Sequence, residues 1–129
     1  MNQLPDKDIE LEQFYNSVPY PHQPFVESHP DRLATVALCF GLKAPSLTSA
    51  RILELGCGSG GNLLPMALSL PGCSFLGIDL SGEQIKEACR IASAAKLSNI
   101  EFKKMNMLEF PASLGKFDYI IAHGVYSWV

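Results

Sequence analysis

The sequence has 129 residues, enough for one domain with a hydrophobic core, and its 47% hydrophobic and 18% charged residues are typical of a globular protein rather than a disordered one. The formal net charge is only −3, and Lys103–Lys104 is the sole adjacent basic pair, so we expect no nucleic-acid partner. Glycines and prolines interrupt the uncharged run over residues 55–78, which excludes a continuous membrane-spanning helix there.

The cysteines and the N-terminus predict a cytoplasmic location. The four cysteines are widely separated and include no Cys-x-x-Cys pair. Their apolar or glycine-rich neighbours predict buried free thiols rather than disulfides or metal ligands at Cys39, Cys57, Cys73 and Cys89. Free thiols suit a reducing compartment, and the polar, acidic N-terminus lacks the pattern of a secretory signal. We therefore expect a soluble cytoplasmic protein with no membrane partner.

Residues 1–29 are predicted to form a helical and extended segment ahead of the main domain. Residues 8–17 mix apolar and acidic residues at a spacing that favours a short helix. Residues 18–25 then carry three prolines in six positions, together with Tyr20, and this excludes a regular helix. The second part is either an extended strap over the body of the domain or a plain connector.

Residues 30–129 are predicted to form one α/β domain. Its expected elements are a helix over 30–41, a loop over 42–50, a strand over 51–55, a helix over 62–70, a strand over 74–79, a helix over 82–97, and strands over 100–104 and 117–122. Strands that alternate with helices at these lengths imply parallel pairing through right-handed crossovers. The predicted fold is a Rossmann-like, doubly wound parallel sheet that is truncated after its fourth strand.

Two of the predicted helices have defined boundaries and an apolar face. Pro30 and Gly41 delimit the first helix, and its apolar residues at helical spacing are Leu33, Val36, Ala37 and Phe40. Ser81 is placed to cap the helix over 82–97, and one face of that helix comprises Ile85, Ala88, Cys89, Ala92 and Ala95. Such faces are typical of helices that pack on a core.

The chemistry centres on the turn after the first strand, Glu54-Leu55-Gly56-Cys57-Gly58-Ser59-Gly60-Gly61. A strand that ends in alternating glycines and opens a helix brings backbone amides close to a ligand, at the sheet edge where such folds bind ligands. Asp79 follows about 20 residues later, where an acid can accept hydrogen bonds from ribose hydroxyls. Because Ser81 caps the next helix, we expect the Asp79 side chain to be free for that role rather than to act as a cap.

The glycine spacing fits two classes of cofactor. Gly56, Gly58 and Gly61 satisfy the dinucleotide pattern G-x-G-x-x-G, while Gly56, Gly58 and Gly60 satisfy G-x-G-x-G. Glu54 favours the second pattern, because an acid on this strand is costly to bury unless it anchors loop amides or faces a cationic ligand. S-adenosylmethionine carries an ammonium and a sulfonium, whereas an acid would repel the pyrophosphate of NAD.

These residues resemble the first motif of the class I S-adenosylmethionine-dependent methyltransferases, an acid followed by Gly-x-Gly-x-Gly. The resemblance continues through Gly77-Ile78-Asp79-Leu80-Ser81, Asn106-Met107 and Phe117-Asp118-Tyr119-Ile120-Ile121, over roughly residues 30–129. The Tyr20-Pro21 segment and His29-Pro30-Asp31-Arg32-Leu33 resemble a narrower subgroup. That subgroup carries an added regulatory domain and includes bacterial protein-lysine methyltransferases.

The resemblance implies S-adenosyl-L-methionine as the cofactor and a binding site for each of its parts. Backbone in the glycine turn would hold the methionine portion, Asp79 the ribose, and Leu80 the adenine face. Asn106, which departs from the aspartate common there, would meet the adenine amino group, with the Met107 amide near the ring. The predicted cofactor-binding residues are Glu54, Gly56, Cys57, Gly58, Gly60, Asn62, Asp79, Leu80, Asn106, Met107, Ala122 and Tyr20.

The resemblance also implies a seven-stranded sheet of order 3-2-1-4-5-7-6, of which the sequence reaches only the fourth strand. That strand would form an open apolar edge, which proteins normally cover. We expect missing C-terminal strands or a partner to cover it, so the chain is either a fragment or a truncated product. On its own it would bind the cofactor weakly and turn over little.

The residues at the end of the fourth strand are candidates for the chemistry. Methyl transfer needs alignment and exclusion of water more than a base. His123 therefore either acts as a catalytic base or polar gate, or only bonds locally, and Tyr126 and Trp128 either line an acceptor pocket or pack in the core. Tyr15 and Tyr20 belong either to a lid over the cofactor or to the core. Three dispersed histidines without clustered carboxylates predict no metal site.

The sequence as a whole predicts an enzyme that transfers a methyl group from S-adenosylmethionine to an unidentified acceptor, with protein lysine as one candidate. Two alternatives stay open. One is a fragment of an NAD-binding oxidoreductase, because the glycines also fit that pattern. The other is a non-catalytic interaction module on a degenerate nucleotide-binding fold, because a fold does not determine a function.

Overall fold

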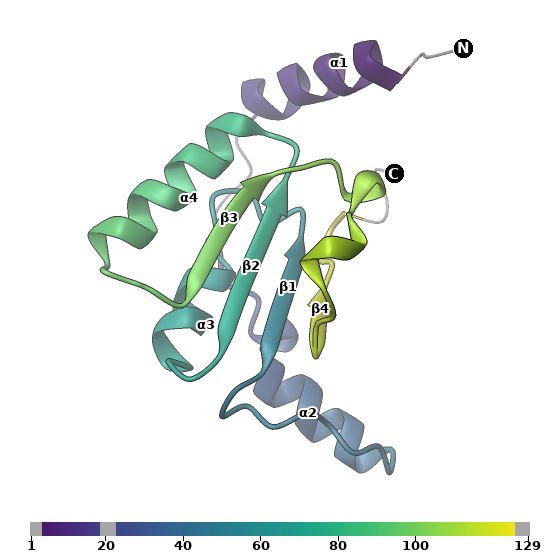
Figure 1. Cartoon of the computed structure of the whole chain (residues 1–129), viewed down its shortest axis with the longest axis vertical. Coiled ribbons are helices and arrows are strands. Elements are labelled where there is room, and N and C mark those ends of the chain that lie inside the picture. Colours follow the sequence, from purple (N-terminus) through teal and green to yellow (C-terminus); the bar gives the residue numbers. More distant parts are fainter. Residues whose placement is uncertain (1–3, 19–22, 126–129) are drawn as a thin grey trace.

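The computed structural model describes residues 4–18 and 23–125 and contains one four-stranded parallel sheet. The strands are β1 (Arg51–Leu55), β2 (Ser74–Asp79), β3 (Ile100–Lys104) and β4 (Tyr119–Ile121), in the order β3-β2-β1-β4 (Figure 1). This order and direction confirm the predicted Rossmann-like fold. β1, β2 and β3 have the predicted bounds, and β4 is shorter than the predicted strand over 117–122.

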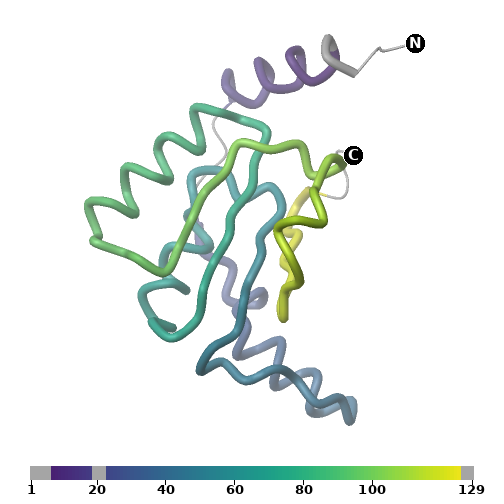
Figure 2. Tube along the Cα trace, in the orientation of Figure 1, coloured from purple at the N-terminus to yellow at the C-terminus, as the bar shows by residue number. Residues whose placement is uncertain are grey.

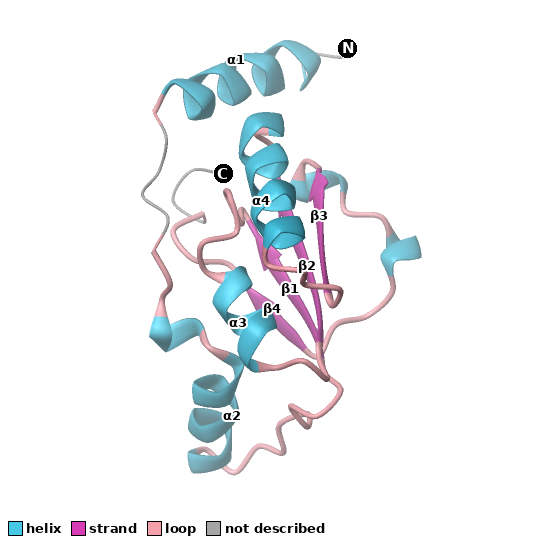
Figure 3. Cartoon of the chain, turned by 90° about the vertical axis from the view of Figure 1, so that its left-hand side faces the viewer, coloured by secondary structure: helices cyan, strands magenta, loops and turns pink. Residues whose placement is uncertain are grey.

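Two helices and two short turns cover the faces of the sheet. The helices α3 (Leu63–Ser69) and α4 (Gly82–Ala94) lie on the same side, as Figure 3 shows. The opposite side packs on the link between β3 and β4, which contains the 3₁₀ turns η2 (Met107–Glu109) and η3 (Ala112–Leu114). Alternating side chains of one strand therefore meet two different cores, as for Ile52 and Leu53 of β1.

The N-terminal elements lie at the two ends of the sheet. The helix α1 (Leu4–Ser17) crosses near the carboxyl ends of the strands, and α2 (Pro30–Cys39) lies at the opposite end (Figures 1 and 2). A 3₁₀ turn, η1 (Val26–Ser28), precedes α2. Of the described part of the chain, no helix combines the length and the apolar character needed to cross a membrane.

The predicted apolar face of the helix after residue 30 is largely not buried. Leu33 packs partly against the core, but Val36 is exposed and Phe40 is 80% exposed. The physical reason is position, because α2 projects away from the sheet and only its beginning approaches the core (Figure 1). A helical spacing of apolar residues identifies a face, but it does not say whether another element covers that face.

The helix α4 confirms the predicted cap and most of the predicted face. The Ser81 hydroxyl accepts a hydrogen bond from the Gln84 amide at 3.2 Å. Its buried residues are Ile85, Ala88 and Ala92, whereas Cys89 and Ala95 are exposed. The prediction of four buried thiols was therefore wrong for Cys39 and Cys89, which lie on the outer sides of their helices. All four cysteines are free thiols, as predicted.

Gly77 allows the close approach of β2 to the ring of Phe102 on β3. A Cβ atom at residue 77 would lie 2.7 Å from the Phe102 ring and 2.8 Å from the Cys57 sulfur. We expect Gly77→Ala to lower the free energy of unfolding by about 1–3 kcal/mol, the usual cost of overpacking a core. Urea denaturation of the two proteins measures this difference.

The matched control for this prediction removes the obstructing ring. In the double variant Gly77→Ala/Phe102→Leu, the contact with the ring is relieved while the contact with the Cys57 sulfur remains, so the loss should be smaller than the sum of the two single losses. Strictly additive losses would show that the contact between residues 77 and 102 does not limit the packing here.

Candidate functional site

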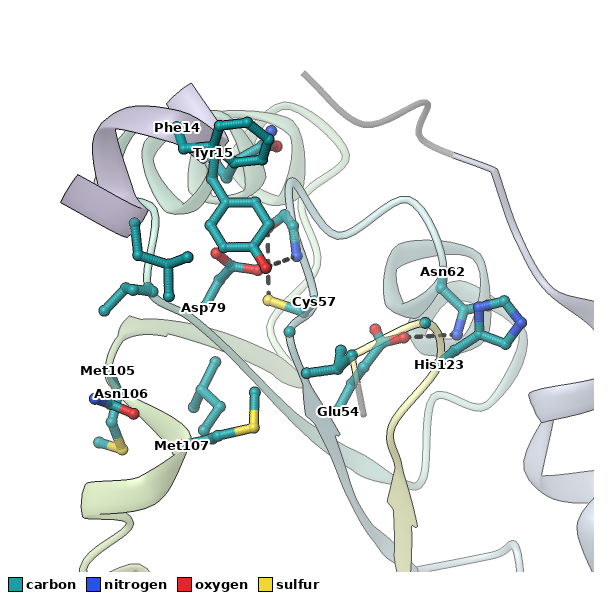
Figure 4. Close-up of a pocket in the computed structure, with 18 of the residues that line it drawn as sticks. Phe14, Tyr15, Glu54, Cys57, Asn62, Asp79, Met105, Asn106, Met107 and His123 are labelled. Carbon is teal, nitrogen blue, oxygen red and sulfur yellow. Dashed lines mark hydrogen bonds between the residues drawn. The ribbon is translucent and has the colours of Figure 1, made fainter. Parts of the chain in front are cut away.

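The carboxyl ends of β1 and β2 open into a cavity of about 840 Å³. Its lining combines the glycine turn, the ends of three strands, α1 and the segment before η1 (Figure 4). Predicted site residues that line it are Glu54, Gly56, Cys57, Gly58, Asn62, Asp79, Leu80, Asn106, Met107 and His123. The structure thus brings together residues that are up to 69 positions apart in the sequence, at the sheet edge where such folds bind ligands.

The glycine turn directs three of its amide groups toward the protein. The Cys57 amide donates to the Ile78 carbonyl at 3.0 Å, and the Gly58 amide donates to Asp79 Oδ2 at 2.8 Å. The Gly60 amide donates to the Cys57 carbonyl at 3.0 Å. These three amides are already paired, so the turn offers few donors for a pyrophosphate, which is bound by free amide groups.

Three glycines of the turn, Gly56, Gly58 and Gly60, have backbone angles that only glycine adopts readily, and at two of them a side chain would also collide with a neighbour. Gly56 has φ of 68°, and a Cβ atom there would collide with the Val125 side chain. Gly60 has φ of 80°, and a Cβ atom there would lie 2.6 Å from the Phe102 ring. Gly60 is not among the residues that line the cavity, and its observed contact is with the core. The sequence analysis had predicted it to be a cofactor-binding residue.

Asp79 accepts a hydrogen bond on each of its carboxylate oxygens. Oδ2 accepts from the Gly58 amide at 2.8 Å, and Oδ1 accepts from the Ser81 amide at 2.9 Å. The expectation that this side chain would be free was therefore wrong, because the end of the strand lies close enough to the turn to bind it. Each oxygen retains a lone pair for a further donor, because an ionised carboxylate offers about four acceptor positions.

Glu54 is a buried carboxyl group with one unpaired oxygen. Its side chain is 3% exposed, and Oε1 accepts a hydrogen bond from the Asn62 amide group at 2.8 Å. Within the described residues, Oε2 has no hydrogen-bond partner. The pKa of Glu54 is raised to about 7, chiefly by burial and to a smaller extent by the negative charge of Asp79, and the Asn62 hydrogen bond opposes this rise. The Glu54 carboxyl group binds a side chain and not a loop amide. Of the two expected reasons for burying an acid here, anchoring loop amides or facing a cationic ligand, only the second remains.

Cys57 lies between these two acids and does not supply a reactive thiolate. It is buried, and that burial, together with the charges of Asp79 and Glu54, raises the pKa of the thiol far above its usual range. The side chain instead packs next to Gly77 of β2.

The far end of the cavity is formed by Leu80, Asn106, Met107 and Leu108. Asn106 already has two protein contacts, because its Oδ1 accepts from the Leu108 amide at 3.0 Å and its Nδ2 donates to Asp8 at 3.1 Å. Asn106 is thus the N-cap of η2. Its predicted contact with an adenine amino group stays a prediction, as do the other assignments taken from the resemblance.

The helix α1 covers the cavity through residues that the sequence analysis did not single out. Asp8 accepts from Asn106, Glu12 pairs with Lys104 at 2.7 Å, and Asn16 accepts from the Ser81 hydroxyl. The Lys104 hydrogen bond lowers the pKa of Glu12. The spacing of four residues places these three side chains on one face of the helix. In the sequence, that spacing was the available sign of a polar helix face that contacts the rest of the domain.

The opposite wall is aromatic. The His123 ring stacks on the Phe25 ring with 3.6 Å between ring centroids and 26° between ring planes. This contact gives His123 a packing role. Tyr15 also lines the cavity, whereas Ala122 does not. Tyr20, Tyr126 and Trp128 lie outside the described residues. Across residues 4–18 and 23–125, no three His, Cys, Asp or Glu side chains are grouped in a way that could hold a metal ion.

The site therefore suits a ligand with a positive charge at the Glu54 end. A buried carboxylate with an open acceptor position requires a cation or a donor beside it, and the paired turn amides do not favour a phosphate. S-adenosylmethionine, which carries an ammonium group, fits this donor and acceptor pattern, and a dinucleotide does not.

Comparison with known proteins agrees with this chemistry. Residues 47–128 match a family model described as "Methyltransferase domain". The uncharacterized protein RP789 of Rickettsia prowazekii is 48% identical over 115 residues, which cover 89% of this chain and 21% of that protein.

Solved structures support the same conclusion. PKMT2 from Rickettsia typhi in complex with AdoHcy superimposes with a TM-score of 0.83 and 46% identity, over 86% of this chain and 21% of that one. A SAM-dependent methyltransferase from Thiobacillus denitrificans in complex with S-adenosyl-L-homocysteine gives a TM-score of 0.58 and 30% identity, over 92% of this chain and 44% of that one. The chain thus spans about a fifth of the length of the two rickettsial proteins. On the family model and these structures, the chain belongs to the class I S-adenosylmethionine-dependent methyltransferases.

Proposed function

We propose that the cavity above β1 and β2 binds S-adenosylmethionine and that the protein transfers its methyl group to the side-chain amine of a protein lysine. The observation that carries the cofactor placement is the unpaired Oε2 of buried Glu54. This oxygen belongs to a residue in the lining of a cavity, next to a glycine turn in which the amides of Cys57, Gly58 and Gly60 are paired within the protein. An ammonium group supplies the missing partner.

The proposed binding mode assigns one function to each part of the cavity. Glu54 binds the ammonium group of the cofactor, and the remaining lone pairs of Asp79 accept from the ribose hydroxyls. Leu80, Asn106 and Met107 surround the adenine. When bound, the cofactor supplies a methyl group activated by its sulfonium. The protein orients this group and excludes water from it, and α1 closes the cavity above it.

The charge of the cavity supports an amine acceptor. Lys7 is the one lysine or arginine in its described lining, against the four acids Asp8, Glu10, Glu54 and Asp79. Such a lining attracts cationic groups and disfavours anionic acceptors. The resemblance to a subgroup that includes protein-lysine methyltransferases and the 46% identity to PKMT2 point in the same direction.

We also propose what surrounds this chain. β4 is an edge strand of the described sheet, with Ile120 exposed on it, so further strands of a longer protein or a partner would cover it. A cytoplasmic location fits the four free cysteines, and the small net charge gives no support for nucleic acid as the partner.

Calorimetric titration with S-adenosylhomocysteine, with NAD in parallel, tests the cofactor site. We expect saturable binding of S-adenosylhomocysteine alone. Asp79→Ala should abolish it, because the variant loses both the ribose acceptors and the hydrogen bond that holds Gly58 in place. Binding of NAD, or no binding of either ligand to folded protein, would contradict the proposal. The second result would favour an interaction module.

The pH dependence of stability tests the state of Glu54. Its pKa is about 7 in the folded protein, against an ordinary value of 4.5 for this side chain, so the folded protein binds more protons than the unfolded chain between these two values. The free energy of unfolding should therefore fall as pH rises from about 4.5 to 7, by up to ~3 kcal/mol at ~1.4 kcal/mol per unit. Glu54→Gln should lack this slope and weaken S-adenosylhomocysteine binding at pH 8. Urea denaturation from pH 5 to 8 measures the slope, and equal slopes in both proteins would refute the assignment.

The acceptor is tested by transfer of a labelled methyl group with the protein at full length. We expect label in polylysine and in lysine-containing peptides, recovered as N-methyllysine after acid hydrolysis, and none in polyarginine. Label confined to phospholipids or to small metabolites would overturn the choice of acceptor. It would leave the cofactor site intact.

A further inference from the structure

Asn62 has three hydrogen bonds that connect separate parts of the site. Its Oδ1 accepts from the Phe25 amide at 2.8 Å, and its Nδ2 donates to Glu54 Oε1 at 2.8 Å and to the Ser28 hydroxyl at 2.9 Å. The residue is 5% exposed and is the N-cap of α3. It makes no side-chain capping bond to that helix, although asparagine is a preferred capping residue. Its polar side-chain atoms instead form hydrogen bonds with residues at and next to the cavity.

These hydrogen bonds set the orientation of the Asn62 side chain. The Phe25 amide is a donor and the Glu54 carboxyl is an acceptor, so only one arrangement of the amide group satisfies both. The contact holds Glu54 through Oε1 and leaves Oε2 as the oxygen without a partner among the described residues. The position of this unpaired oxygen therefore depends on Asn62.

The same residue holds the aromatic wall. Phe25 is fixed through its backbone amide by Asn62, and its ring stacks on His123. The Ser28 hydroxyl, which accepts from Asn62, donates to the Phe25 carbonyl at 2.8 Å and closes a ring of hydrogen bonds. Figure 4 shows Asn62 beside both Glu54 and His123. These contacts thus connect Glu54 on β1 to His123, two residues beyond the end of β4.

We propose that Asn62 is a positioning residue, which aims Glu54 at the cationic end of the cofactor and fixes Phe25 and His123 as the neighbouring wall. This inference rests on the proposed function, because Glu54 must contact the cofactor. An ionised Glu54 binds the Asn62 amide more strongly than a neutral one. Cofactor binding therefore tightens the hold on residues 25–28, and by linkage the ordered segment strengthens cofactor binding.

The test combines calorimetry with hydrogen exchange of residues 23–29, with and without S-adenosylhomocysteine. In the wild type, the ligand should slow exchange at these residues. Asn62→Ala should raise the Kd by about tenfold, which corresponds to ~1.4 kcal/mol, and should leave residues 23–29 rapidly exchanging whether or not the ligand is bound.

Asn99→Ala is the matched control. Asn99 has the same side chain and donates to the Ala67, Leu70 and Cys73 carbonyls at 3.0–3.2 Å, and it does not line the cavity. This variant should lose stability but keep the Kd and the ligand-dependent protection. If Asn62→Ala behaves like Asn99→Ala in both measurements, Asn62 is only a structural residue and the proposal is wrong.

Asn62→Asp separates the two contacts and serves if Asn62→Ala does not fold. It keeps the acceptor for the Phe25 amide but replaces the donor to Glu54 with a second negative charge. We expect weaker ligand binding and retained basal protection of residues 23–29. An unchanged Kd in this variant would overturn the proposal. Failure of the wild type to bind S-adenosylhomocysteine would overturn the proposed function together with it, whereas normal binding by every variant would overturn this inference alone.

Discussion

The carboxylate of Asp79 joins the ends of the two central strands. It accepts the Gly58 amide from the turn after β1 and the Ser81 amide at the start of α4. These contacts hold the glycine turn open to the cavity and fix the first turn of α4. They also place a negative charge close enough to Glu54 to raise its pKa. Asp79 thus fixes the geometry of the turn and adds to the negative charge of the cavity.

The cavity is completed by residues that precede the sheet in the sequence. Asp8 contacts Asn106, and Phe25 contacts His123, so both walls join an N-terminal residue to a residue beyond β3. The parallel strands provide the floor and the acids, while α1 and the segment before η1 provide the enclosure. Enclosure matters for this chemistry because water competes with the acceptor and weakens electrostatic contacts.

The sequence was informative where local signals decide the structure. Three strands have the predicted bounds, and for β1 and β2 the reason is local, because the β-rich runs end before Gly56 and at Asp79. Ser81 caps α4 as its pattern indicates. Burial was less predictable, because Phe40 and Cys89 have apolar neighbours, but Phe40 follows the exposed end of α2 and Cys89 lies on the outer side of α4. Contacts between distant residues were not predictable from one sequence, since nothing local pairs Asn62 with Phe25 or Glu12 with Lys104.

The polar contacts of α1 have a consequence for how the enclosure of the cavity responds to salt. The side chains of Glu12 and Lys104 are 23% and 51% exposed, and Glu12 also accepts from the Gly82 amide at 3.2 Å. Salt screens ion pairs that are partly exposed to solvent, whereas the sheet is held by a buried apolar core. The enclosure of the cavity therefore depends on ionic strength more strongly than its floor does.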